Sequence, residues 1–214
     1  ADSIAHYHSV YIDVVVTVFM ILFGINFNLF YLILIGQVVQ ALKSEELRWY
    51  LGIILASIAM IAVNIYSLYG SVAQSVRYSA FQVGSIITTT GYATADFAQW
   101  PYFSQTILLL LMVLGACAGS TGGGIKTIRL IILLKSIRRE IRRMVHPRSV
   151  GLVRAEGKVV EEDTVHGVHV YLITYFVIMF LSVLLVSING FDLVTTISSV
   201  FTCLNNVGPG LGPV

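Results

Sequence analysis

Long apolar stretches alternate with short polar segments along most of the chain. Four of them, at about residues 10–40, 51–70, 102–135 and 168–188, reach the length of about 20 residues that crosses the hydrocarbon core of a bilayer. The pattern therefore predicts four membrane spans. Lipid tolerates irregular backbone only beside protein or water, so any break within a span needs a structural reason.

Two further apolar stretches, residues 78–92 and 191–208, are too short to complete a crossing. Residues 78–87 predict a helix of roughly 15 Å, which is about half the thickness of the hydrocarbon core. Each stretch ends in a polar turn that contains glycine. The pattern predicts two half-helices that enter the membrane and return as polar loops.

The half-helices belong to a repeat with an offset of 117 residues, which places Gly91 on Gly208 and the second span on the fourth. An even number of crossings separates the two copies, so both point the same way through the membrane. Parallel copies suit an arrangement around one axis normal to the membrane, as a pore requires. Two copies cannot close a ring, which predicts more repeats in the complete protein.

The repeat predicts an all-α integral membrane fold of span, pore helix and span units, with a broken third span, like the pore of a potassium channel. Residues 1–48 are expected to form the exit span of a preceding repeat and a cytoplasmic turn. Residues 49–135 form a complete unit, 136–165 a basic cytoplasmic linker, and 166–214 an incomplete following unit that ends at its filter.

Composition and charge agree with this fold. Hydrophobic residues make up 57% of the chain and charged residues only 11%, against roughly 25% charged residues in ordinary globular domains. Twelve of the thirteen Lys and Arg residues lie within 42–50 or 126–164, and Arg77 is the exception. Because positive charge collects on the cytoplasmic side, both polar loops should open from the outside.

The polar turns carry the chemistry of a pore for a monovalent cation. A dehydrated cation needs several oxygens in place of its water, and main-chain carbonyls supply them without a fixed charge. Each half-helix aims the negative end of its dipole at the membrane centre. One such turn alone is typical of ordinary loops, but two at matching positions favour a pore. The candidate filter residues are Thr88, Thr89, Thr90, Gly91, Tyr92, Asn205, Asn206, Val207 and Gly208.

The third span contains a glycine-rich break. As one helix, residues 101–135 would reach roughly 50 Å, far beyond a bilayer core of about 30 Å. We predict a mobile gating loop beneath the filter; close helix packing through small residues is the alternative. A phosphate-binding loop is excluded, because Ile125 separates Gly124 from Lys126. The candidate gating residues are Gly115, Ala116, Cys117, Ala118, Gly119, Ser120, Thr121, Gly122, Gly123, Gly124 and Lys126.

Residues 135–143 should continue the third span into the cytoplasm as a basic amphipathic helix. Anionic lipid headgroups are the simplest partner for such a helix. A docking surface for a cytosolic regulator is the alternative, since a helix joined rigidly to the gate would transmit a pull.

The motifs at residues 88–93, 115–126 and 205–210 resemble the TrkH/KtrB superfamily of potassium transporters, and the TrkH branch in particular. The resemblance covers essentially the whole chain. It implies four repeats around one permeation path, with this chain covering the end of the second repeat, the third, and part of the fourth. It also implies potassium uptake across the bacterial inner membrane, a homodimer, and a cytosolic nucleotide-binding subunit of the TrkA type.

An ion-coupled symporter with broken helices is the alternative function, although those folds often use inverted repeats. We do not expect an enzyme, because no Ser, His and Asp set falls within the spans. The expected ligand is K⁺ as the permeant ion, without an organic cofactor. Membrane lipids are expected partners and nucleic acid is not.

Overall fold

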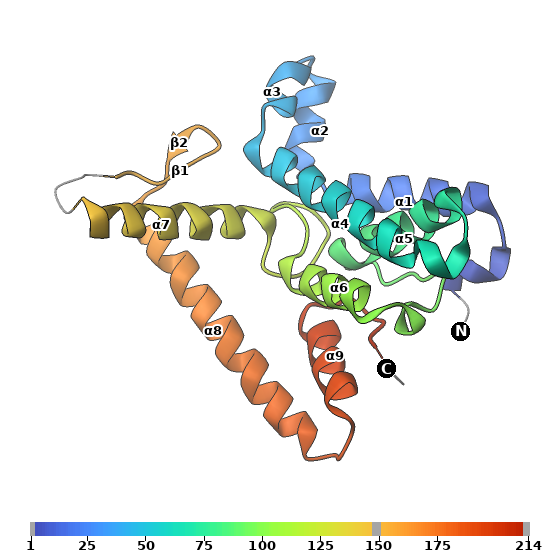
Figure 1. The fold of residues 1–214 in the computed structure, drawn as a ribbon. Helices are drawn as coiled ribbons and strands as arrows, with labels where there is room; N and C mark the ends of the chain where they lie inside the picture. The colour runs from blue at the N-terminus through green and yellow to red at the C-terminus, as the bar shows by residue number, and fades with distance from the viewer. Residues whose placement is uncertain (1–2, 147–150, 212–214) are drawn as a thin grey trace.

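The computed structural model describes residues 3–146 and 151–211 and is almost entirely helical (Figure 1). Residues 1–2 of the first predicted unit, 147–150 of the predicted linker and 212–214 of the last predicted unit lie outside the described residues. The elements are η1 (Ser3–Tyr7), α1 (Val10–Phe23), α2 (Phe27–Leu34), α3 (Val38–Leu42), α4 (Glu45–Tyr69), α5 (Val72–Ile87), η2 (Phe97–Gln99), α6 (Tyr102–Leu114), α7 (Thr127–Val145), β1 (Arg154–Ala155), β2 (Lys158–Val159), α8 (Glu162–Ser187) and α9 (Leu193–Leu204).

Two single helices of the described chain, α4 and α8, are long and apolar enough to cross a membrane. They correspond to the second and fourth predicted spans, and each begins about six residues earlier than predicted. Ser44 caps α4, because its hydroxyl accepts a bond from the backbone N–H of Leu47 at 3.2 Å. Gly70 ends the helix in the left-handed conformation, with φ of 63°.

The first predicted span, residues 10–40, is broken into separate helices. Helices α1 and α2 meet at an angle of 94°, and α2 with α3 projects away from the other helices (Figure 1). Asn26 makes the corner, since its side chain accepts a bond from the N–H of Asn28 at 2.9 Å and starts a new helix. An apolar pattern alone does not reveal this break.

The third predicted span is broken as expected. Helix α6 ends at Leu114 and α7 begins at Thr127, so the glycine-rich segment between them is not helical and the helix-packing alternative does not apply. Helix α7 continues away from the bundle to Val145, and the short β1–β2 hairpin lies beside it (Figure 1). The hairpin is a small exception to the all-α prediction.

Both half-helices are present. Helix α9 falls within the predicted stretch, whereas α5 starts at Val72 and is longer than the predicted 78–87. The side chain of Asp192 caps α9 by accepting from the N–H of Thr195 at 3.1 Å. Hydrogen bonds from the hydroxyl and the N–H of Thr195 hold the pKa of Asp192 below its usual range, so this cap is charged at neutral pH.

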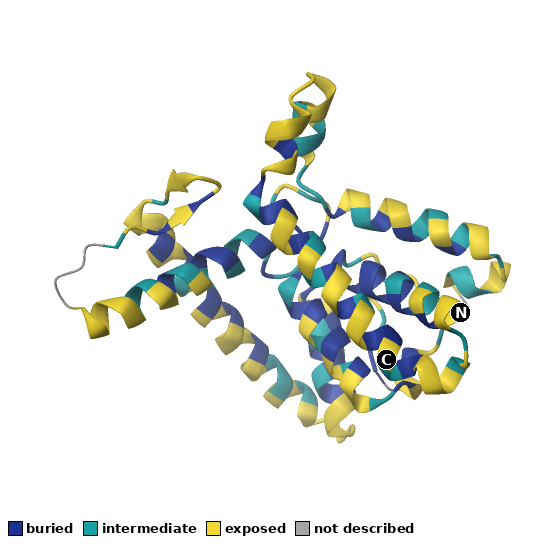
Figure 2. Cartoon of the chain, turned by 45° about the horizontal axis from the view of Figure 1, so that its top comes forward, coloured by how far each residue is buried: buried dark blue, intermediate teal, exposed yellow. Residues whose placement is uncertain are grey.

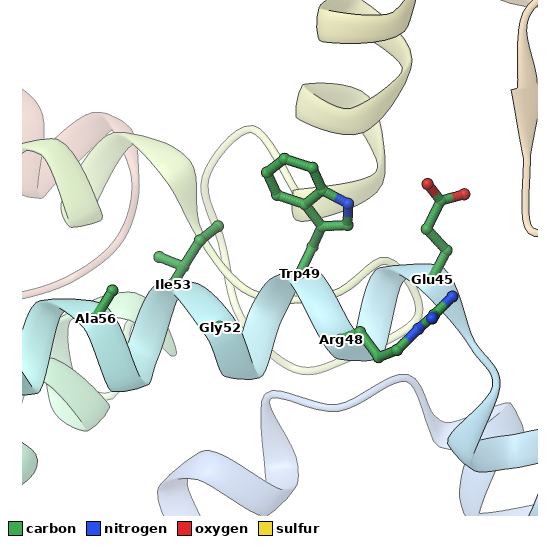
Figure 3. Close-up of a pocket in the computed structure, with 6 residues that line it drawn as sticks. All are labelled: Glu45, Arg48, Trp49, Gly52, Ile53 and Ala56. Atoms are coloured by element: carbon green, nitrogen blue, oxygen red, sulfur yellow. The ribbon is translucent and has the colours of Figure 1, made fainter.

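Buried residues collect where α4, α5 and α6 meet (Figure 2). Val207 and Leu211, from beyond α9, join this cluster, so the second polar loop is part of the core. Elsewhere large apolar side chains are exposed, as a bilayer or further protein requires. A groove along the first half of α4 (Figure 3) lies outside the polar loops; its lining residues are Glu45, Arg48, Trp49, Gly52, Ile53 and Ala56.

Candidate functional site

The two polar loops are built by the same backbone hydrogen bonds at the offset of 117 residues. After α5, the N–H of Thr90 donates to the carbonyl oxygen of Ser85 at 2.9 Å. After α9, the N–H of Val207 donates to the carbonyl oxygen of Thr202, also at 2.9 Å. The repeat seen weakly in the sequence therefore extends to individual hydrogen bonds.

Left-handed backbone occurs at the same two positions of each loop. Thr89 has φ of 54° and Asn206 has φ of 56°, followed two residues later by Gly91 at 80° and Gly208 at 107°. Only glycine adopts the second conformation without steric cost. A non-glycine residue at the first position is a strained backbone of the kind that clusters at functional sites.

The two loops lie against each other. A Cβ atom added to Gly91 would collide with the carbonyl oxygen of Val207, and one added to Gly208 would come within 3.9 Å of the Cα of Gly91. The absence of a side chain at Gly91 is therefore required both by its backbone angle and by the neighbouring loop.

Unpartnered carbonyl oxygens line this contact. Within the described part of the chain, no group donates a hydrogen bond to the carbonyl oxygens of residues 88–91 or 205–208. Tyr92 differs from the other predicted filter residues, because its carbonyl oxygen accepts the hydroxyl of Ser85 at 2.5 Å. The carbonyl oxygen of Pro209 is likewise occupied, by the hydroxyl of Thr202 at 3.1 Å.

Hydroxyl and amide side chains hold the loops in place from behind. The hydroxyls of Thr88 and Thr90 are 2.8 Å apart, and Thr88 also donates to the carbonyl oxygen of Gly84 at 2.7 Å. In the second loop the buried Asn205 accepts a bond from the hydroxyl of Tyr175 on α8 at 2.9 Å. The side-chain oxygens thus serve the scaffold and leave the carbonyls free.

The glycine-rich segment forms a loop that closes on itself at its base. The N–H of Ile125 donates to the carbonyl oxygen of Val113, and the N–H of Lys126 donates to the carbonyl oxygen of Leu114, both at 3.0 Å. A Cβ on Gly115 would collide with the carbonyl oxygen of Gly123. The two ends of the break are therefore joined side by side.

One side of the loop rests on the corner between α1 and α2. The N–H of Cys117 donates to the carbonyl oxygen of Gly24 at 3.1 Å, and the N–H of Phe27 donates to the carbonyl oxygen of Gly119 at 3.0 Å. The hydroxyl of Thr121 donates to Phe23 at 3.4 Å. Two breaks that are far apart in the sequence thus satisfy each other's backbone hydrogen bonds. Inside a membrane such partners are needed, because lipid offers none to backbone N–H and C=O groups.

The tip of the loop, Gly122 and Gly123, touches both polar loops. The N–H of Gly123 donates to the hydroxyl of Thr89 at 2.8 Å, and a Cβ on Gly123 would collide with the carbonyl oxygen of Asn205. A Cβ on Gly122 would lie 3.2 Å from the carbonyl oxygen of Thr88. The structure thus brings the predicted filter and gating residues together.

The side chain of Lys126 forms a hydrogen bond within the glycine-rich loop. Its φ is 76°, in the left-handed region, and its ammonium group donates to the carbonyl oxygen of Gly122. The sequence analysis named Lys126 among the candidate gating residues. The structure places its charge at the tip of the glycine-rich loop.

Glu46 was missed as a site residue. It is 5% exposed, and its Oε1 accepts from the N–H of Ala118 at 2.7 Å and of Ile128 at 3.0 Å. It lies in the first turn of α4, where an acid ordinarily does no more than favour the helix dipole. An ionisable residue so close to an apolar span was the available signal.

The geometry defines a class: a helical membrane protein in which half-helices and non-helical loops meet at one polar centre. The described residues contain no cluster of three His, Cys, Asp or Glu side chains able to hold a metal. The family model TrkH, a cation transport protein, matches residues 1–214. The chain belongs to the TrkH family, which is a family of transporters and not of enzymes.

Relatives and solved structures agree with this family. The Trk system potassium uptake protein TrkH of Escherichia coli K12 is 33% identical over 99% of this chain, and that of Vibrio parahaemolyticus is 32% identical. The crystal structure of the potassium transporter TrkH from Vibrio parahaemolyticus superposes with a TM-score of 0.91 at 31% identity. The chain spans 44% of the length of the Escherichia coli relative and 46% of the solved chain.

These findings confirm the resemblance inferred from the sequence. They also confirm the fold class, a helical integral membrane protein with several membrane-crossing segments.

Proposed function

We propose that this chain supplies two neighbouring loops of a potassium-selective filter, together with the loop that gates it. The observation that carries the proposal is the row of carbonyl oxygens at residues 88–91 and 205–208 that accept no hydrogen bond from the described residues, on two loops in mutual contact. The names of the relatives, which are potassium uptake proteins, support potassium as the ion.

In this mechanism the carbonyl oxygens replace the water of a K⁺ ion as it enters from the outside. The C-terminal ends of α5 and α9 adjoin the loops, so their negative dipole ends favour a cation there. No fixed carboxylate is needed, which keeps binding weak enough for the ion to leave. The left-handed residues at matching positions hold the same backbone path in both loops.

The loop of residues 115–126 closes the path on the inner side of the filter. Its tip contacts both filter loops, and the Lys126 ammonium beside Gly122 places a positive charge where a cation would leave the filter. A like charge at such short range opposes the passage of K⁺. Opening then requires the tip, with Lys126, to move aside.

We infer that the working protein completes the ring with further repeats. Residues 49–135 act as one complete unit, 136–165 as the cytoplasmic linker, and 1–48 and 166–214 as parts of flanking units. We further propose a homodimer in the bacterial inner membrane, in contact with lipid and regulated by a cytosolic nucleotide-binding subunit of the TrkA type. The matching hydrogen bonds of the two loops favour this pore over an ion-coupled symporter.

Rubidium uptake tests the proposal. The product of the complete gene is expressed in cells that lack their own potassium uptake, and entry of labelled Rb⁺ is measured. We expect K⁺ to compete with Rb⁺ while Na⁺ at the same concentration does not. Equal competition by Na⁺, or no uptake above that of empty cells, would contradict a potassium filter.

Replacing Tyr175 with phenylalanine is expected to reduce the discrimination between K⁺ and Na⁺. The change removes the hydrogen bond to Asn205, worth about 1 kcal/mol, and leaves a buried acceptor unpaired. We expect a loss of selectivity of roughly fivefold, measured as the ratio of K⁺ to Na⁺ competition against Rb⁺. Tyr171→Phe is the control, because the Tyr171 ring packs on Arg129 and its hydroxyl has no such role. Equal effects of the two variants would contradict the assignment.

A further inference from the structure

The glycine-rich loop is held by a carboxylate that belongs to another element. Oε1 of Glu46, in the first turn of α4, accepts from Ala118 on one side of the loop and from Ile128 on the other, at 2.7 and 3.0 Å. One oxygen atom therefore ties both the glycine-rich segment and the first turn of α7 to the start of α4. Hydrogen bonds to an ionised group are among the stronger ones in proteins.

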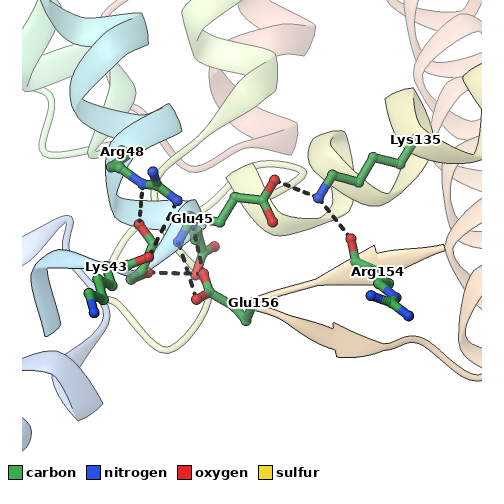
Figure 4. A network of polar contacts seen from close by, with 8 residues as sticks. Lys43, Glu45, Arg48, Lys135, Arg154 and Glu156 are labelled. Atoms are coloured by element: carbon green, nitrogen blue, oxygen red, sulfur yellow. Dashed lines mark hydrogen bonds and ion pairs between the residues drawn. The ribbon is translucent and has the colours of Figure 1, made fainter. Parts of the chain in front are cut away.

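The start of α4 is in turn held by the cytoplasmic hairpin. Oε1 of Glu156 accepts from the N–H of Glu46 at 2.7 Å and from the hydroxyl of Ser44 at 2.9 Å, and its Oε2 accepts from the N–H of Glu45 at 3.2 Å (Figure 4). Glu156 thus caps α4 from outside, where the free N–H groups and the positive end of the dipole favour an anion.

The hairpin is also tied to α7. The ammonium group of Lys135 donates to the carbonyl oxygen of Arg154 at 2.7 Å and pairs with Glu45 (Figure 4). The hairpin therefore contacts both the start of α4 and α7, the helix that follows the glycine-rich loop, and the start of α4 cannot shift without disturbing these contacts.

Glu156 occupies a backbone position that does not suit glutamate. The turn between β1 and β2 has φ of 51° at Glu156 and 74° at Gly157, the two-residue pattern that prefers Asn-Gly. A long side chain with positive φ is uncommon and costs stability. The turn itself disfavours glutamate at position 156, but a glutamate side chain is long enough for its carboxylate to reach α4. These contacts explain why glutamate occupies this position.

We propose that Glu46 and Glu156 are positioning residues that connect the cytoplasmic hairpin to the gating loop, so that displacement of the hairpin releases the gate. The connection runs from Glu156 through the first turn of α4 to Glu46, and from there to Ala118 in the loop and Ile128 at the start of α7. The proposal rests on the function proposed above for that loop.

The first test replaces Glu46 with alanine in the product of the complete gene, reconstituted alone in lipid vesicles. Rb⁺ flux per folded transporter at rest is expected to rise about tenfold, because both bonds to the loop are lost. Glu46→Gln keeps an acceptor without the charge, so its rise should be smaller, roughly threefold. Glu161→Ala, at an exposed acid that caps no helix through its side chain, is the control. Unchanged or lower flux in Glu46→Ala, with folded protein, would overturn the proposal.

The second test replaces Glu156 with asparagine, which the turn prefers, so the hairpin itself is retained. Flux at rest should rise roughly threefold, and amide hydrogen exchange within residues 115–128 should become faster, at a distance from the substitution. Glu161→Gln removes the same charge nearby and should change neither. If exchange in that loop stays at the native rate, the connection through α4 is wrong.

The double variant distinguishes a connected path from two separate effects. If Glu156 acts through Glu46, the combination of Glu46→Ala and Glu156→Asn should conduct no more than Glu46→Ala alone. Effects that multiply would overturn the connection. The exchange measurement does not depend on ion flux, so faster exchange with unchanged flux would reject the gate, and unchanged exchange would reject the connection.

Discussion

Replacement of Gly91 with serine is expected to reduce Rb⁺ uptake by more than about tenfold and to weaken the preference for K⁺ in what remains. Gly91 has φ of 80°, where a non-glycine residue costs on the order of 1–3 kcal/mol. The new Cβ would also collide with the carbonyl oxygen of Val207, a proposed ion ligand on the neighbouring loop. Relief of that collision must move one of the two loops.

The control for Gly91 separates backbone strain from the proposed filter. Gly36 has φ of 81°, and a Cβ added there would meet nothing within 4 Å. Gly36→Ser therefore carries the same conformational cost without the contact, and uptake per folded transporter should stay near the native value. Full uptake with native selectivity in Gly91→Ser would show that the loop has only a structural role and would favour the ion-coupled symporter over the pore.

Replacement of Gly123 with alanine is expected to increase Rb⁺ flux at rest, in reconstituted vesicles, by about tenfold. The described conformation has no room for a Cβ at Gly123, because it would collide with the carbonyl oxygen of Asn205. The φ of Gly123 is not in the left-handed region, so the substitution is otherwise tolerated. The collision disfavours the position of the loop beneath the filter, and a cost of about 1.4 kcal/mol shifts the equilibrium tenfold.

Gly52→Ala is the control for Gly123→Ala, since a Cβ on Gly52 meets nothing within 4 Å. Its flux should equal that of the native protein. A decrease in flux in Gly123→Ala would show that enlarging the tip blocks the path, and would contradict a gate that opens by moving aside.

The sequence contained most of the fold because its strongest signals are local. The presence of α4 and α8, the half-helices α5 and α9, and the break after Leu114 all follow from the order of apolar, polar and glycine residues along the chain. The offset of 117 residues predicted which positions correspond, and the structure has matching hydrogen bonds at those positions.

The corner between α1 and α2 shows why other features were not predictable. Residues 10–40 read as one apolar span, yet the helix turns by 94° at a point where Gly24 and Phe27 exchange hydrogen bonds with the glycine-rich loop. A Cβ on Gly24 would also collide with the hydroxyl of Tyr50. The break is stabilised by partners that lie far away in the sequence, so no local pattern predicts it.

The sequence by itself determined the class of protein, the number of polar loops, and the glycines on which they depend, because helix length, hydropathy and backbone freedom are properties of short segments. The tertiary structure alone decided which carbonyl oxygens have no donor among the described residues, where the tip of the glycine-rich loop rests, and that Glu46 holds that loop. Glu46 and Ala118 are separated by 72 residues, and a hydrogen bond between such groups exists only once the helices that carry them have packed together.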